Sequence, residues 1–145
     1  LIYQTHGAAS MDFIRIAGAA AEGVIMSAGP VMSPETQADS ALTKKPGLTL
    51  NVAYEAKYGP SSRSQFAGHS YDAFEVLKRI IPVALKAGKP GTPEFRAALR
   101  DAMENMGRTV LAHGVLNWTA EDHWGYTNET GVMLKVVNGE FKVEQ

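Results

Sequence analysis

The segment Gly68-His69-Ser70-Tyr71-Asp72 carries residue types that could do chemistry. The nucleophile of an α/β-hydrolase stands in a G-x-S-x-G turn between a strand and a helix, and a helical pattern follows this segment. Asp72 occupies the place of the second glycine, and the sequence has no HGGG-like oxyanion loop. Asp122-His123 is the only adjacent acid–histidine pair that follows, and its neighbouring side chains need not meet in triad geometry. A hydrolase that uses Ser70 is therefore one alternative, and a helix capped by Ser70 is the other.

Four histidines could in principle converge on a metal ion: His6, His69, His113 and His123. None of them is spaced as in HExxH or a comparable ligand pair. Cysteine is absent, which excludes thiolate ligands and disulfides. The sequence therefore predicts no metal site and no cofactor.

Two glycine-containing turns, His6-Gly7 and Gly68-His69-Ser70, each follow a short apolar run and precede a helical pattern. In an open α/β sheet the ligand crevice lies beyond the carboxyl ends of the strands, where backbone amides and helix N-termini face outward. Both turns are therefore predicted to bind a small polar or anionic group. The candidate ligand-binding residues are His6, Gly7, Gly68, His69, Ser70 and Tyr71.

Three aromatic residues, Trp118, Trp124 and Tyr126, could form a wall of the same site. Packing in the core or at a hinge is an equally good interpretation of these rings.

Strand and helix patterns alternate along the chain and end in a hairpin, which predicts an α/β fold with a parallel sheet flanked by helices. Asn138-Gly139 supplies the two positive-φ positions of a type I′ turn. Proline at 82 is expected to kink the longest helix, and Asp72 to complement the dipole of that helix at its N-terminus. Helices are predicted over about 10–17, 48–58, 70–88 and 92–107, and strands over 1–3, 24–26, 115–118, 132–136 and 141–143.

Composition excludes several classes of function. The chain has 145 residues, 45% of them apolar, which is long enough for one hydrophobic core. With 14 basic and 15 acidic residues and no basic stripe, nucleic acid is not expected as a partner. No apolar run approaches the ~20 residues of a membrane span, so membrane insertion is not expected. The chain opens with Leu1-Ile2-Tyr3, without initiator Met or signal-like region, and we expect a fragment or a processed chain.

Four segments resemble, in the same order, the periplasmic solute-binding proteins of ABC transporters of the branched-chain amino acid (Leu/Ile/Val)-binding type. They are 16–25 (IAGAAAEGVI), 54–59 (YEAKYG), 67–73 (AGHSYDA) and 137–141 (VNGEF). The resemblance covers nearly the whole chain and implies the C-terminal portion of a two-lobed type I periplasmic-binding-protein fold. On this basis residues of about 1–60 and 115–145 belong to the second lobe, and about 65–112 to the first.

The resemblance also implies a function: non-enzymatic binding of a small-molecule ligand in an extracytoplasmic, periplasmic compartment and delivery to a membrane permease. A ligand-sensing receptor domain with the same fold is an alternative. In amino-acid-binding members, a second-lobe loop offers a carboxylate to the ligand's ammonium group, whereas here the loop 4–9 (QTHGAA) contains no acid. Because a buried ammonium without a counter-charge is costly, we expect an organic acid, with an aromatic carboxylate favoured over a free amino acid. The Asp122-His123 pair followed by Gly125 is similar to members that take aromatic or other organic acids.

Overall fold

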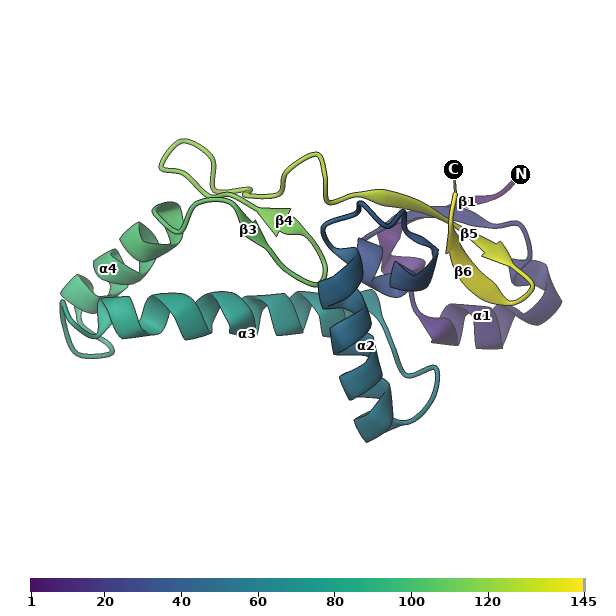
Figure 1. The fold of residues 1–145 in the computed structure, drawn as a ribbon, viewed down its shortest axis with the longest axis horizontal. Coiled ribbons are helices and arrows are strands. Elements are labelled where there is room, and N and C mark those ends of the chain that lie inside the picture. The colour runs from purple at the N-terminus through teal and green to yellow at the C-terminus, as the bar shows by residue number, and fades with distance from the viewer. Residues whose placement is uncertain (145) are drawn as a thin grey trace.

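The computed structural model describes residues 1–144, and Figure 1 shows them as an elongated α/β molecule with a sheet at one end and a long helix reaching to the other. The α-helices are α1 (Met11–Ala17), α2 (Lys44–Tyr58), α3 (Gln65–Ala84) and α4 (Pro93–Glu104). The strands are β1 (Tyr3–Gln4), β2 (Ile25–Ala28), β3 (Thr109–Val110), β4 (Val115–Leu116), β5 (Val132–Val137) and β6 (Glu140–Val143). Short 3-10 helices cover His6–Ala8, Gly18–Ala21, Pro30–Met32 and Pro34–Thr36.

The main sheet has the strand order β1-β2-β5-β6. Only β1 and β2 are parallel, whereas β5 pairs antiparallel with both β2 and β6. The α/β fold with a C-terminal hairpin is thus confirmed, and the sheet is mixed. The hairpin turn is as predicted, because Asn138 has φ 54° and Gly139 has φ 73°. Glu22 secures this turn by accepting hydrogen bonds from the backbone amides of both residues.

Side chains that alternate along β5 build the first core. Leu134 and Val136 are buried, while Met133, which precedes Leu134, is exposed, as the two-residue period of a strand requires. They pack with Met26 of β2 and Ile14 of α1.

A second core lies under α3. Val76 and Ile80, one helical turn apart, contact Leu111 and Leu116, which flank the turn of the two-stranded β3–β4 ladder. Helix α4 packs its apolar side, including Leu99, against the same cluster. Figure 1 shows α4 and the β3–β4 pair on one side of α3.

The start of α3 differs from the prediction. The N-cap is Ser64, whose Oγ accepts a hydrogen bond from the amide of Ala67 at 3.2 Å, so the helix begins at Gln65 and Ser70 does not cap it. Gly68 and His69 lie in the first turns of the helix and not in a loop after a strand. The predicted strand–turn–helix elbow around Ser70 is therefore wrong.

The other helix boundaries agree more closely with the sequence. Helix α4 begins at Pro93 and is capped by Thr92, as predicted. Helix α2 begins at Lys44, one turn earlier than expected, with Pro46 in its first turn, where a missing amide costs little. Pro82 lies inside α3 near its C-terminal end.

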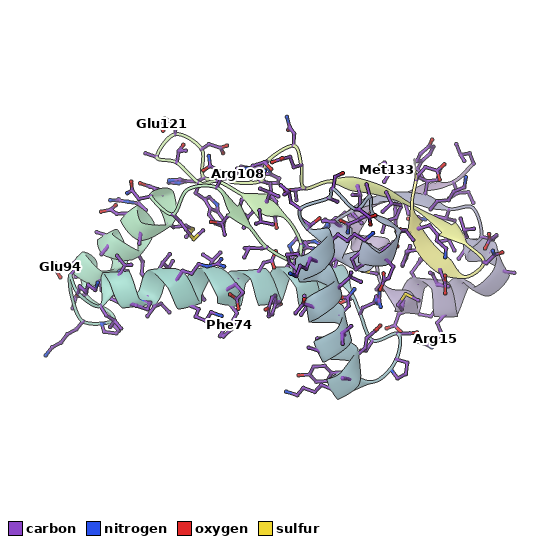
Figure 2. All side chains as sticks on the ribbon, viewed as in Figure 1. Arg15, Phe74, Glu94, Arg108, Glu121 and Met133 are labelled. Atoms are coloured by element: carbon purple, nitrogen blue, oxygen red, sulfur yellow. The ribbon has the colours of Figure 1, made fainter. Side chains whose placement is uncertain are left out.

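One side of α3 is apolar and uncovered. Its apolar residues recur at helical spacing, and their exposed fractions range from 36% to 57%: Phe74, Leu77, Ile81 and Leu85. Figure 2 shows Phe74 projecting from the side of α3 that faces away from β3–β4. Within residues 1–144, no helix is both long enough and apolar enough to cross a membrane.

Candidate functional site

A cavity of about 420 Å³ opens where the main sheet meets the N-terminal end of α3 and the segment that follows β4. Three histidines and two aromatic residues converge on it from distant parts of the chain. Its lining residues are His6, Ser27, Ala28, Gly29, His69, His113, Trp124, Tyr126, Thr127, Asn128, Thr130 and Gly131.

A second cavity, of about 380 Å³, lies beside Arg63. The guanidinium of Arg63 is already paired with Glu35 at 2.8 Å and with Glu55 at 2.9 Å. Lys142 of the same cavity pairs with Glu140 at 2.6 Å. Both basic side chains of this cavity therefore already have acidic partners, and the histidine cavity is the better candidate.

Each histidine of the cavity is placed by a different element. His6 lies in the 3-10 helix after β1, His69 in the first turns of α3, and His113 in the turn between β3 and β4. The ring centroids are 4.1 Å apart for His69 and His113, 5.5 Å for His6 and His69, and 6.4 Å for His6 and His113. One ring nitrogen from each lies within 4.8 Å of the others.

His113 is the buried member of the cluster, with 1% of its surface exposed. Its ring fits against Gly29 and Gly68, because a Cβ on Gly29 would overlap the ring and one on Gly68 would lie 2.9 Å from Nδ1. Within residues 1–144, neither ring nitrogen has a hydrogen-bond partner. Burial, followed by the nearby His69 and His6, lowers the pKa of His113 to about 3, so the ring is neutral at pH 7.

Asp72 fixes the turn that carries His113. Its two carboxylate oxygens accept hydrogen bonds from the backbone amides of Ala112, at 3.0 Å, and His113, at 2.8 Å. Burial raises the pKa of Asp72 to about 6, although the two amides act in the opposite direction. The predicted role of Asp72 at the helix terminus is wrong, because the residue lies two turns into α3 and serves the β3–β4 turn.

Tyr126 orients His69 from the opposite wall, with its Oη 3.1 Å from Nδ1 of the imidazole. Burial, and then the charge of His6, lowers the pKa of His69. The ring of Trp124 packs 6.1 Å from that of Tyr126 and is 77% exposed at the cavity mouth. Trp118 belongs instead to the second core, where it lies against Gly125. Two of the three residues of the predicted aromatic wall thus lie at the cavity.

The structure brings together some of the predicted ligand-binding residues and not others. His6 and His69 line the cavity, and Gly68 lies behind it as the seat of the His113 ring. Gly7, Ser70 and Tyr71 are exposed and are not among the lining residues. Successive residues of an α-helix are rotated by about 100°, so Ser70 and Tyr71 leave the cavity side that His69 occupies.

The Asp122-His123 pair, the remaining candidate partner of Ser70 in a hydrolase triad, is engaged in other contacts. His123 contacts Glu104, with Nε2 2.8 Å from the carboxylate, and Asp122 accepts from the amide of Trp124. No side-chain hydrogen bond of Ser70 is formed within residues 1–144, so no triad is assembled around it.

The predicted ligand-binding residues did not include His113, which was considered only as a possible metal ligand, or the polar residues between 127 and 130. Thr130 links β4 to the strand that follows, since its Oγ1 accepts from the amide of Val115 and donates to the carbonyl of the same residue. One local feature of the sequence indicates that His113 is buried. It directly follows the apolar run 110–112, a position unusual for a solvent-exposed side chain.

No family model matches the chain, and no curated protein matches it. Solved structures do. The protein Rp1789 of Rhodopseudomonas palustris strain CGA009 is 60% identical and superposes with a TM-score of 0.91 over all of this chain and 41% of its own. An extracellular ligand-binding receptor from Rhodopseudomonas palustris HaA2 is 61% identical, with a TM-score of 0.91 over all of this chain and 41% of that one.

The leucine binding protein LivK of Thermotoga maritima shares the fold alone, at 21% identity and a TM-score of 0.66 over 99% of this chain and 36% of that one. The chain therefore spans about two fifths of the length of the structures it matches.

Proposed function

We propose that this chain is the C-terminal part of an extracytoplasmic solute-binding protein. It has the α/β fold of part of a type I periplasmic binding protein, and it resembles extracellular ligand-binding receptors along its whole length. Its ligand is a small organic acid, and an aromatic carboxylate is favoured over a free amino acid. The protein binds this ligand between two lobes and delivers it to the membrane permease of an ABC importer in the periplasm.

One observation carries the choice of ligand: the cavity gathers three imidazoles and two aromatic rings, and none of its lining residues is acidic. The ammonium group of an amino acid would enter this part of the site without a counter-charge, which is costly when the group is buried. A carboxylate, in contrast, can accept hydrogen bonds from imidazole N–H groups and from the hydroxyl of Thr127 or the amide of Asn128.

The aromatic part of the proposal rests on Trp124 and Tyr126. Their rings stand at the mouth of the cavity, in position for an edge or offset contact with a ligand ring. The volume of about 420 Å³ falls within the ordinary range of small-molecule sites, about 300–1,000 Å³.

We also propose the two-lobe division, with about 1–60 and 115–145 in one lobe and about 65–112 in the other. The separation of the two cores supports it, as does the cavity, which takes His6 and Ser27 from one set of segments and His69 and His113 from the other. Leu116 and Tyr126 pack with the α3 core, which supports a proposed return to the sheet at about residue 127 in place of 115.

Calorimetry of the complete protein with leucine and with a panel of benzoates and cinnamates tests the proposed ligand. We expect aromatic carboxylates to bind and leucine not to bind. His69→Ala should weaken carboxylate binding at least about tenfold, since a hydrogen bond to a charged group contributes about 1.5–3 kcal/mol. The matched variant His123→Ala, at an exposed histidine outside the cavity, should bind as the parent does. Tight leucine binding without any response to aromatic acids contradicts the proposal.

A further inference from the structure

The histidine cluster has a composition typical of a metal site. His6, His69 and His113 each offer one ring nitrogen within 4.8 Å of the other two, and no carboxylate takes part in the group. Three nitrogen donors suit zinc and the later first-row transition metals, whereas magnesium and calcium require oxygen ligands.

His113 supplies a second, independent indication of a ligand. Its side chain is almost fully buried, and neither nitrogen has a hydrogen-bond partner among the described residues. Buried polar atoms are nearly always paired, because an unpaired one costs the full desolvation of the group. The ring also lies in a fitted space against Gly29 and Gly68, which holds it beside His69.

The neighbouring groups support coordination by the other two rings. The hydroxyl of Tyr126 contacts Nδ1 of His69 and leaves Nε2 of that ring for a metal, in the way that outer partners orient metal-bound histidines. The side-chain amide of Gln65 donates to the carbonyl of His6 and ties that loop to the start of α3. The same amide nitrogen lies 3.2 Å from Nδ1 of His6, which leaves Nε2 of that ring for a metal. His6 is exposed, so its ring can adjust its position toward the other two.

We propose that His6, His69 and His113 together bind one divalent transition-metal ion, of which Zn²⁺ is the type case, through three imidazole nitrogens. A tetrahedral zinc site with nitrogen ligands at about 2.0–2.1 Å needs the three donors to close in from their present spacing. Three protein ligands leave a fourth position, which opens into the cavity. The inference uses residues of the proposed ligand site but does not rest on the proposed function.

The test uses the complete protein without a polyhistidine tag, stripped with a chelator. It is titrated with Zn²⁺ by calorimetry and with Co²⁺ by visible absorption, which reports tetrahedral coordination. We expect His6→Ala, His69→Ala and His113→Leu each to weaken Zn²⁺ binding at least about tenfold, the lower range seen when a metal site is disturbed. His123→Ala, outside the cluster, is the matched control and should bind as the parent does.

His6 lies in an exposed segment, so His6→Ala tests the inference even if His113→Leu disturbs folding. Zn²⁺ binding that survives in His6→Ala and His69→Ala, or that is lost in His123→Ala, overturns the inference. Titration of the aromatic acids in the presence of EDTA separates the two proposals. Zn²⁺ binding without acid binding supports the metal site and contradicts the proposed function, and acid binding without Zn²⁺ binding does the reverse.

Discussion

Replacing His113 with leucine should change how the stability of the protein depends on pH. In the folded chain the pKa of His113 is lowered from 6.5 to about 3 by burial and by His69 and His6, whose ring centroids lie 4.1 and 6.4 Å away. The unfolded chain retains the ordinary value, so between pH 6.5 and 3 only the unfolded state binds this proton. His113 therefore lowers the free energy of unfolding as the pH falls through this window.

The magnitude follows from the two pKa values. Each pH unit in this window changes the free energy of unfolding by about 1.4 kcal/mol. Between pH 6.5 and pH 4, His113 therefore lowers this free energy by about 3 kcal/mol. Asp72, whose carboxylate binds the amide of His113, acts in the opposite direction. Its pKa is raised from 3.8 to about 6, so the folded state takes up the proton first as the pH falls. The free energy of unfolding therefore rises by about 3 kcal/mol between pH 6 and pH 3.8. In the parent protein the two contributions nearly cancel, and in His113→Leu only that of Asp72 remains.

Urea denaturation at pH 4, 5, 6 and 7, followed by both circular dichroism and tryptophan fluorescence, measures this difference. The free energy of unfolding of His113→Leu minus that of the parent should grow by about 3 kcal/mol from pH 7 to pH 4. Met133→Leu, at an exposed side chain of β5 that does not titrate, is the control and should show no such growth. A difference between His113→Leu and the parent that is constant across this range refutes the reasoning.

Two further perturbations test how the site is built. Asp72→Ala leaves the buried amides of Ala112 and His113 without acceptors, so the free energy of unfolding at pH 7 should fall by about 2–4 kcal/mol in urea titrations. Asp101→Ala, at an exposed carboxylate, is its control and should change stability by less than about 1 kcal/mol. Gly29→Ala places a Cβ where the His113 ring lies and should destabilise the protein by about 1–3 kcal/mol in the same titrations. Gly131→Ala, at a glycine of the same cavity with open space around it, should be nearly neutral; equal losses in the two glycine variants would contradict the fitted seat of the ring.

Local signals in the sequence were sufficient for some elements. The hairpin at Asn138-Gly139 and the start of α4 at Thr92-Pro93 were predicted because turn and cap chemistry depend on adjacent residues. The start of α3 was not predicted, since Ser64 and Ser70 can both cap a helix and the apolar period is the same from either. The choice depends on non-local contacts, namely Gly68 packed against His113 and Gln65 bound to the carbonyl of His6.

The histidine cluster shows the same limit more strongly. His6, His69 and His113 come from three separate elements, so no spacing motif records their proximity. His69 and His6 were found because both were assigned to loops at one end of a sheet, although His69 in fact belongs to a helix. His113 could be found only by its position in an otherwise apolar segment, because its burial depends on two glycines far away in the sequence.

The uncovered apolar side of α3 has a consequence for the behaviour of the molecule in solution. This side forms a strip of exposed apolar surface, made by Phe74, Leu77, Ile81 and Leu85. A net charge of −1 provides almost no long-range repulsion between copies of the chain. Wherever this strip is left uncovered, sedimentation should show association that increases with protein concentration. Added salt should not reverse it, because contacts between apolar surfaces are not screened by ions as charge pairs are.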